Sequence, residues 1–148
     1  MPWLIVVVIA SLLANRSGLP LLPLAEWVGY IIGASLAALG MSLLALGLKA
    51  SSLKVLIGRD KSVLVTRGIY SYIRHPFCLS CILLAFSAAI GFRSAVGLMI
   101  AILALVIIYV RALFEEKGLE RRFGQAYCEY KSKVGMFIPK RKRVRSPG

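Results

Sequence analysis

Long apolar segments with almost no charge are the feature that most constrains how this chain can fold. Residues 24–48 contain one charged residue, Glu26, and residues 94–113 contain one, Arg111. As a helix rising about 1.5 Å per residue, the first of these segments is longer than a hydrocarbon core of about 30 Å. Only helices or closed barrels satisfy their backbone polar groups in lipid. We therefore expect helices that cross a membrane.

The composition supports an all-α integral membrane bundle. Of 148 residues, 59% are hydrophobic and 17% are charged, and a soluble domain of this length would carry more charge. We expect about four transmembrane helices over residues 2–14, 24–48, 76–92 and 94–113, of which the first is too short to span fully. Small residues on the second helix, spaced by three or four, predict close packing on another helix or a dimer: Gly29, Gly33, Ala37 and Gly40.

An amphipathic helix is expected after the last apolar segment. Leu119, Phe123, Tyr127 and Tyr130 are spaced by four, four and three, so they share one helix face that suits the membrane surface. We interpret residues 1–139 as a single domain and residues 140–148 as a basic flexible tail.

The charge distribution predicts the orientation. The net charge is +13, but the basic residues flank apolar segments, which favours anionic lipid headgroups over nucleic acid as the partner. With four spans, Arg16 and Arg93 fall on one side of the membrane and the other seventeen Lys and Arg on the opposite side. The positive-inside rule then places the central loop and both termini in the cytoplasm.

The cysteine and histidine content argues against metal chemistry. Cys78 and Cys81 are spaced like a redox pair, but the chain has three cysteines and one histidine, too few ligands for a zinc site. Ordinary helix residues account for these cysteines better than a thiol oxidoreductase does.

A polar and basic stretch between the apolar segments contains that histidine. Pro76 disfavours the α conformation at His75 and suits the first turn of a helix, so Arg74 and His75 lie where an aqueous loop enters the membrane. The predicted topology brings Arg111, Glu115 and Glu116 to the same face. Charges at such a depth indicate a functional site or an interfacial anchor, and the residues alone leave both open.

Two motifs resemble those of the isoprenylcysteine carboxyl methyltransferases and the related phospholipid methyltransferases. The first is LVTRGIYSYIRHP at residues 64–76. The second is EEKGLERRFGQAYCEY at residues 115–130, followed by Val134 and by Phe-Ile-Pro at 137–139. They occur in the family's order with a helical hairpin between them, although Ser62 stands where many members have histidine.

The resemblance implies a small membrane enzyme that transfers a methyl group from S-adenosylmethionine to a lipophilic acceptor. The acceptor is expected to be a carboxylate such as that of a prenylated cysteine, with a phospholipid amine as the alternative. The catalytic residues expected from the motifs are Arg74, Arg111 and Glu115, of which Arg111 would bind the acceptor. Those expected to bind the cofactor are Ser62, Val63, Leu64, Val65, Tyr70, His75, Pro76, Phe77, Cys78, Glu115 and Glu116.

Overall fold

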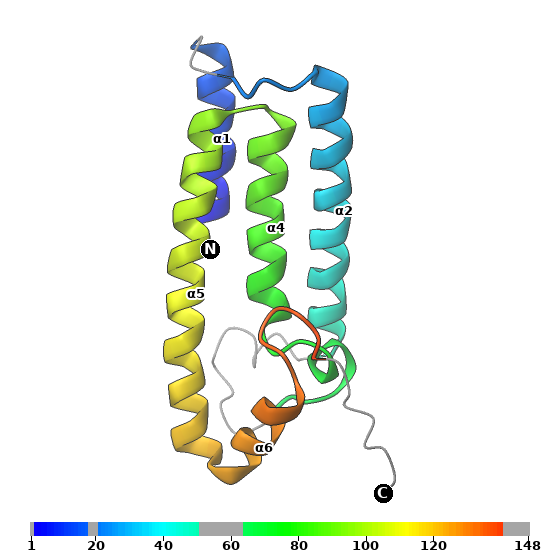
Figure 1. Cartoon of the computed structure of the whole chain (residues 1–148), viewed down its shortest axis with the longest axis vertical. Helices are drawn as coiled ribbons and strands as arrows, with labels where there is room; N and C mark the ends of the chain where they lie inside the picture. The colour runs from blue at the N-terminus through cyan, green and yellow to red at the C-terminus, as the bar shows by residue number, and fades with distance from the viewer. Residues whose placement is uncertain (1, 18–20, 51–63, 141–148) are drawn as a thin grey trace, which may run out of the picture.

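The computed structural model describes residues 2–17, 21–50 and 64–140, and the regular secondary structure in these ranges is helical (Figure 1). The described residues form no β-sheet, only the isolated β-bridges Leu21–Ser94 and Ile73–Gly135. The elements are α1 (Pro2–Arg16), α2 (Glu26–Ala50), the 3-10 turn η1 (Gly68–Ser71), α4 (Pro76–Gly91), α5 (Ala95–Phe123) and α6 (Gln125–Lys133). The predicted all-α class is confirmed. The predicted site residues Ser62 and Val63 lie outside the described residues.

Helix α4 is the centre of the bundle. It packs against α2 on one flank, α5 on the other, and α1 (Figure 1). Its first residue is Pro76, and His75 is its N-cap with φ −122° and ψ 59°, so the predicted helix start is confirmed. The link to α5 is short, as predicted, and makes the two helices antiparallel. Ser94 caps α5 by accepting a hydrogen bond of 2.9 Å from the backbone N–H of Gly97.

The predicted small-residue stripe on α2 packs within the molecule, against α4. A Cβ added at Gly33 would lie 2.8 Å from the Cα of Gly91, and one added at Gly40 would lie 3.0 Å from the Cγ of Leu84. The Ser87 hydroxyl donates a hydrogen bond of 2.9 Å to the Gly33 carbonyl across the same interface. Small residues therefore let the two backbones approach closely, as in other membrane helix pairs.

Helix α1 covers only part of the length of the bundle. Its Pro2 end lies part-way along α4 (Figure 1). Val7 is fully buried and packs with Ala85, Ala89 and Ala101 of α4 and α5. The core at this end of the bundle is therefore built largely from small side chains.

Helix α5 is longer than the sequence pattern predicts. It continues ten residues past the expected end at Leu113, to Phe123, so residues 115–123 belong to it rather than to a separate surface helix. A Cβ added at Gly118 would meet nothing within 4 Å, and most of the residues around it are charged helix formers. The helix therefore continues without a break beyond its apolar segment. Gly124, with φ +53°, ends it, and α6 follows in a new direction.

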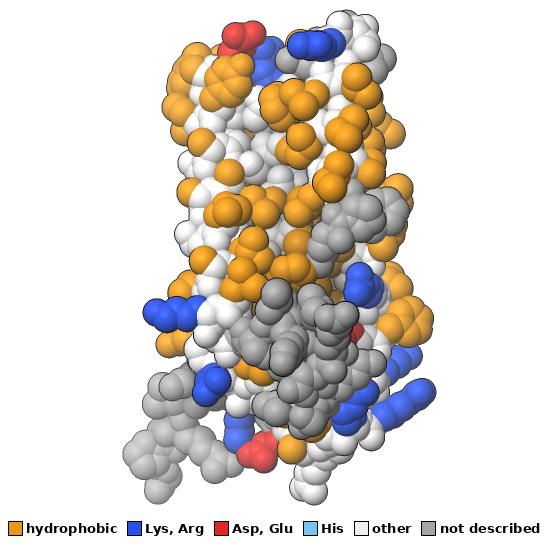
Figure 2. Space-filling view, turned by 180° about the vertical axis from the view of Figure 1, so that it is seen from behind, with side chains coloured by type: hydrophobic (Ala, Val, Ile, Leu, Met, Phe, Trp, Pro, Cys, Tyr) orange, Lys and Arg blue, Asp and Glu red, His pale blue; other side chains and the backbone are white. Residues whose placement is uncertain are grey.

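The surface between the two ends of the molecule is apolar. Figure 2 shows hydrophobic side chains over the middle of the bundle and charged ones gathered toward its ends. Large exposed side chains include Trp27 on α2 and Met99 on α5, which are 67% and 72% exposed. By length and hydropathy, α2 and α5 are candidate membrane spans, while α4 and residues 4–14 of α1 are shorter apolar helices. Such a surface suits a membrane protein.

Candidate active site

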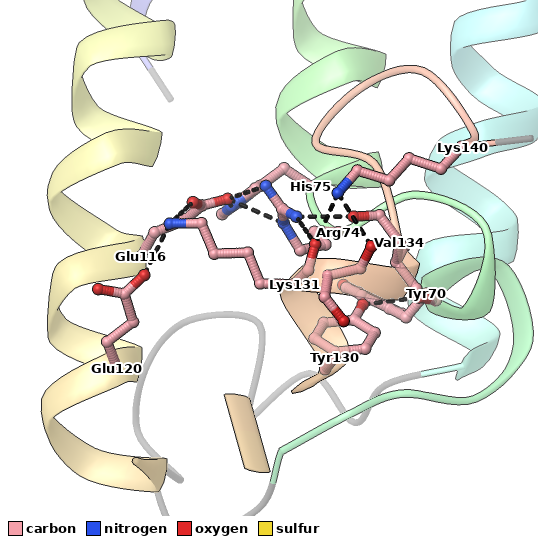
Figure 3. A network of polar contacts seen from close by, with 10 residues as sticks. Tyr70, Arg74, His75, Glu116, Glu120, Tyr130, Lys131, Val134 and Lys140 are labelled. Carbon is pink, nitrogen blue, oxygen red and sulfur yellow. Dashed lines mark hydrogen bonds and ion pairs between the residues drawn. The ribbon is translucent and has the colours of Figure 1, made fainter. Parts of the chain in front are cut away.

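The two sequence motifs meet at one end of the bundle. Residues 70–75 precede α4, residues 115–120 belong to the charged end of α5, and residues 127–140 return from α6 (Figure 3). The chain between them forms the antiparallel pair α4 and α5. Segments some 40 to 60 residues apart in the sequence therefore share one polar cluster.

Glu116 is the centre of this cluster. Its side chain is 3% exposed, and its Oε1 lies 2.7 Å from Nη2 and 2.9 Å from Nε of Arg74, which is 7% exposed. Lys131 Nζ lies 3.0 Å from Glu116 Oε2 and 2.6 Å from Glu120 Oε1 (Figure 3). A buried carboxylate is costly unless its oxygens are matched in this way. The cluster thus joins the loop before α4, α5 and α6.

Arg74 uses its remaining donors to hold the returning chain. Its Nη1 donates to the carbonyl oxygens of Lys131 at 2.9 Å and Val134 at 2.6 Å. Its backbone N–H donates to Gly135 O at 2.9 Å, and that of His75 donates to Met136 O at 3.2 Å. A Cβ at Gly135 would lie 1.7 Å from Ile138 O, so only glycine fits this turn. Each nitrogen of the Arg74 guanidinium is therefore engaged by the chain itself.

His75 is buried beside the cluster with a ring nitrogen that lacks a hydrogen bond. Its Nε2 lies 3.4 Å from Glu116 Oε1, outside hydrogen-bond geometry, and no other described group accepts from or donates to it. The ring of Phe137 lies 6.3 Å away between centroids. Burial lowers the pKa of His75 below its ordinary value, although Glu115 and Glu116 act in the opposite direction. The imidazole is consequently neutral near pH 7.

Two tyrosines of α6 close the other side of the cluster. The Tyr130 hydroxyl donates a hydrogen bond of 2.6 Å to the carbonyl of Tyr70, and burial raises the pKa of Tyr130 to about 12. Tyr127 is 1% exposed, and its hydroxyl has no hydrogen-bond partner among the described residues. Tyr70 is thus fixed through its backbone carbonyl.

Arg111 and Glu115 are placed differently from Arg74 and Glu116. They lie one turn apart on α5, both are exposed, and both are close enough to Cys78 to influence it electrostatically. No described residue forms an ion pair with either of them. The structure therefore brings His75, Cys78, Arg111 and Glu115 to one region, where the charges of Arg111 and Glu115 have no ion-pair partner among the described residues.

The other described residues that were predicted to bind the cofactor also lie at this end of the bundle. Leu64, Val65 and Phe77 are half-buried, and Pro76 is buried as the first residue of α4. Sequence reasoning missed Lys131, which forms an ion pair with Glu116, and Glu120, which pairs with the same lysine. The four-residue spacing of Glu116 and Glu120 was a usable signal for a shared face. The position of Lys131 depends on the turn at Gly124, and no signal in the sequence pointed to it.

A larger hollow lies away from the polar cluster. It has a volume of about 600 Å³ and is lined almost wholly by apolar groups of α1, α2 and α4, including Leu4, Gly33, Leu84 and Gly91. With so few polar groups, it provides no means of binding or positioning charged reactants. Its lining is suited to an apolar group.

Comparison with known proteins agrees with the motifs. The profile of the phospholipid methyltransferase family matches residues 28–126. Methanethiol S-methyltransferase 1 of Bradyrhizobium diazoefficiens is 34% identical over 76 residues, which are 51% of this chain and 26% of that protein. Methanethiol S-methyltransferase of a Pseudomonas species is 34% identical over 86 residues, 58% of this chain and 32% of that protein.

A eukaryotic relative matches over a similar length. The protein-S-isoprenylcysteine O-methyltransferase of Saccharomyces cerevisiae is 38% identical over 78 residues, 52% of this chain and 33% of that protein. The chain thus spans about a quarter to a third of the length of these curated relatives. No solved structure matches it significantly. Since the family profile covers well over half of the sequence, the chain belongs to the phospholipid methyltransferase family.

Proposed function

We propose that this protein is an S-adenosylmethionine-dependent methyltransferase that acts on a lipophilic acceptor at the membrane surface. The observation that carries the proposal is the arrangement at one end of the bundle. The buried His75 Nε2, which makes no hydrogen bond within the described residues, lies in the same region as Arg111 and Glu115, two opposite charges without described ion-pair partners. Family membership supports methyl transfer as the reaction.

The described residues fit the proposed cofactor. The Glu115 carboxylate suits its ammonium or ribose hydroxyls, and the unpartnered Nε2 of His75 suits its carboxylate end or a bridging water. Leu64, Val65, Tyr70 and the first turn of α4 from Pro76 to Cys78 supply a wall that is largely apolar. When bound, S-adenosylmethionine supplies an electrophilic methyl group.

The chain's own contribution is to position the reactants and to exclude water. Arg111 would hold an acceptor carboxylate through paired hydrogen bonds and direct one oxygen at the methyl group. A carboxylate is already ionised, so no general base is needed. Positioning and desolvation supply most of the acceleration when nucleophile and sulfonium lose charge together. Arg74 is then a positioning residue, because its donors hold Glu116 and the returning chain.

The proposed topology is four membrane helices with the site in the cytoplasm. Helices α1, α2, α4 and α5 stand side by side in one bundle (Figure 1), and most of the described Lys and Arg residues lie toward the end that holds the polar cluster. The positive-inside rule favours the cytoplasmic face for that end. The lipophilic part of the acceptor would then stay in the bilayer while the cofactor arrives from water.

A small thiol is a second candidate acceptor. Two of the relatives carry the name methanethiol S-methyltransferase. For a thiol, Arg111 would favour the thiolate that acts as nucleophile. Measuring methyl transfer to three acceptors side by side distinguishes a thiol, a carboxylate and an amine substrate. The three acceptors are methanethiol, a prenylated cysteine with a free carboxylate, and short-chain phosphatidylethanolamine.

Calorimetric binding of S-adenosylhomocysteine to the purified protein tests the cofactor assignment. We expect saturable binding to the wild type and at least ten-fold weaker binding to His75→Ala and Glu115→Ala, since charge-assisted hydrogen bonds contribute about 1.5–3 kcal/mol. Glu129→Ala is the matched control, because Glu129 lies exposed on α6 and pairs with Lys133. A folded wild type that binds no S-adenosylhomocysteine in detergent or in nanodiscs would instead indicate a non-catalytic membrane protein.

A further inference from the structure

A second hollow lies where the end of α2 meets η1, and it combines cationic with apolar groups. Its volume is about 390 Å³. One wall comes from the last turn of α2 and the other from the start of η1. The lining residues are Leu46, Lys49, Ala50, Arg67, Gly68 and Ile69.

The hollow depends on a close approach between these two elements. Gly68 has φ +62°, and a Cβ added there would lie 2.8 Å from the Cβ of Ala50. Both the backbone conformation and the space therefore require glycine at this position. The pocket is a consequence of how η1 docks on α2.

The charge of the pocket is unbalanced. Lys49 and Arg67 both line it, and no carboxylate within residues 2–17, 21–50 or 64–140 pairs with either of them. Lys49 in the last turn of α2 interacts favourably with the negative end of the helix dipole, but Arg67 lies outside that helix and has no such role. Two cations that line one pocket without a counter-charge among the described residues favour an anion.

The apolar side of the pocket continues along the membrane-facing surface. Leu46 is 49% exposed, and Leu39, about two turns earlier on the same face of α2, is 52% exposed; α2 is a candidate membrane span. Lys49 and Ala50 end that span, so the cations stand at the level where a bilayer changes from acyl chains to headgroups.

We propose that this pocket binds the phosphate of an anionic membrane phospholipid. Lys49 and Arg67 hold the phosphate, Ile69 and Ala50 pack against the glycerol region, and the acyl chains lie along Leu46. The site is distinct from the proposed acceptor site, because Arg111 and Glu115 belong to α5, on the opposite flank of α4 from α2 (Figure 1). The proposal does not depend on methyl transfer.

Binding of short-chain lipids to the purified full chain tests the proposal. We expect dioctanoyl phosphatidylglycerol to bind saturably and to raise the unfolding temperature of the wild type. Lys49→Gln/Arg67→Gln should bind it about thirty-fold more weakly, which corresponds to about 1 kcal/mol for each cation near a membrane surface. Both side chains are exposed, so the variant should unfold at the wild-type temperature without lipid.

The control Arg121→Gln/Arg122→Gln removes the same charge from the exposed end of α5 and should bind like the wild type. Dioctanoyl phosphatidylcholine should bind at least ten-fold more weakly than the anionic lipid. Equal weakening in both double variants would overturn the proposal in favour of diffuse attraction. Inorganic phosphate binding as tightly as the lipid would overturn it in favour of a soluble phosphorylated ligand.

Discussion

At the scale of single residues, the Glu116 carboxylate has the largest consequence for stability. It is buried between Arg74 and Lys131, and Arg74 is 7% exposed. Glu116→Gln would leave the Arg74 guanidinium buried without its counter-charge, and breaking such a pair costs about 3–5 kcal/mol. Thermal unfolding in detergent measures the loss. Glu120→Gln, at a site 35% exposed, should cost under about 1 kcal/mol. Similar losses in the two variants would contradict this ranking.

His75 gives the stability a dependence on pH. Burial lowers its pKa in the folded protein below the ordinary value of about 6.5, so the folded state binds fewer protons than the unfolded state. The contribution of the neutral imidazole is present above pH about 6.5 and is lost as the pH falls through the folded pKa. Unfolding temperature measured from pH 8 to 5 should therefore decline in the wild type more steeply than in His75→Gln. Parallel profiles would show that other groups cause the decline.

The adjacent glutamates show what single-residue reasoning could reach. The sequence predicted both Glu115 and Glu116 as cofactor residues. In the structure Glu115 is exposed near Cys78, while Glu116 is buried against Arg74, so neighbouring positions on a helix face different surroundings. The sequence contains no signal that selects one of the two as the partner of Arg74, which is 42 residues away. A role for Glu116 toward the cofactor stays a prediction.

At the scale of helices, the same glycine-to-alanine substitution is expected to have opposite effects on stability at two positions. Gly33→Ala places a Cβ 2.8 Å from Gly91 Cα and forces α2 away from α4, which should cost about 1–3 kcal/mol. Gly118→Ala meets nothing within 4 Å on α5 and should stabilise by about 0.5–1 kcal/mol through helix propensity. Unfolding temperatures of the two variants against the wild type measure both changes. A stabilised Gly33→Ala would indicate that the helix pair is looser than the structure shows.

Periodicity and hydropathy identified the helices but not where they end. The predicted starts at residues 2 and 76 agree with the structure, since apolar runs and Pro76 mark them. The end of α5 was misplaced by ten residues, because a change from apolar to charged residues signals a change of solvent and not of backbone conformation. Only Gly124, with φ +53°, breaks that helix.

At the scale of the whole molecule, the proposed orientation can be tested with cysteine labelling. Cys128 is exposed on α6 at the polar end, and Ser17 is exposed just after α1 at the other end. In a background of Cys78→Ser and Cys81→Ser, a membrane-impermeant maleimide added to intact cells should label Ser17→Cys and spare Cys128. Permeabilised cells should show both labelled. Labelling of Cys128 in intact cells would reverse the orientation.

The hydrogen bonds of Arg74 also fix when the site can assemble during synthesis. Its acceptors come 42, 57 and 60 residues later in the chain, at Glu116, Lys131 and Val134. At about 5–20 residues per second, the ribosome delivers the last of these groups several seconds after Arg74. Until then, the Arg74 guanidinium lacks part of its acceptors. The site is therefore completed only after α4 and α5 have been synthesised, and a nascent chain halted before residue 134 lacks part of the cluster that holds Arg74.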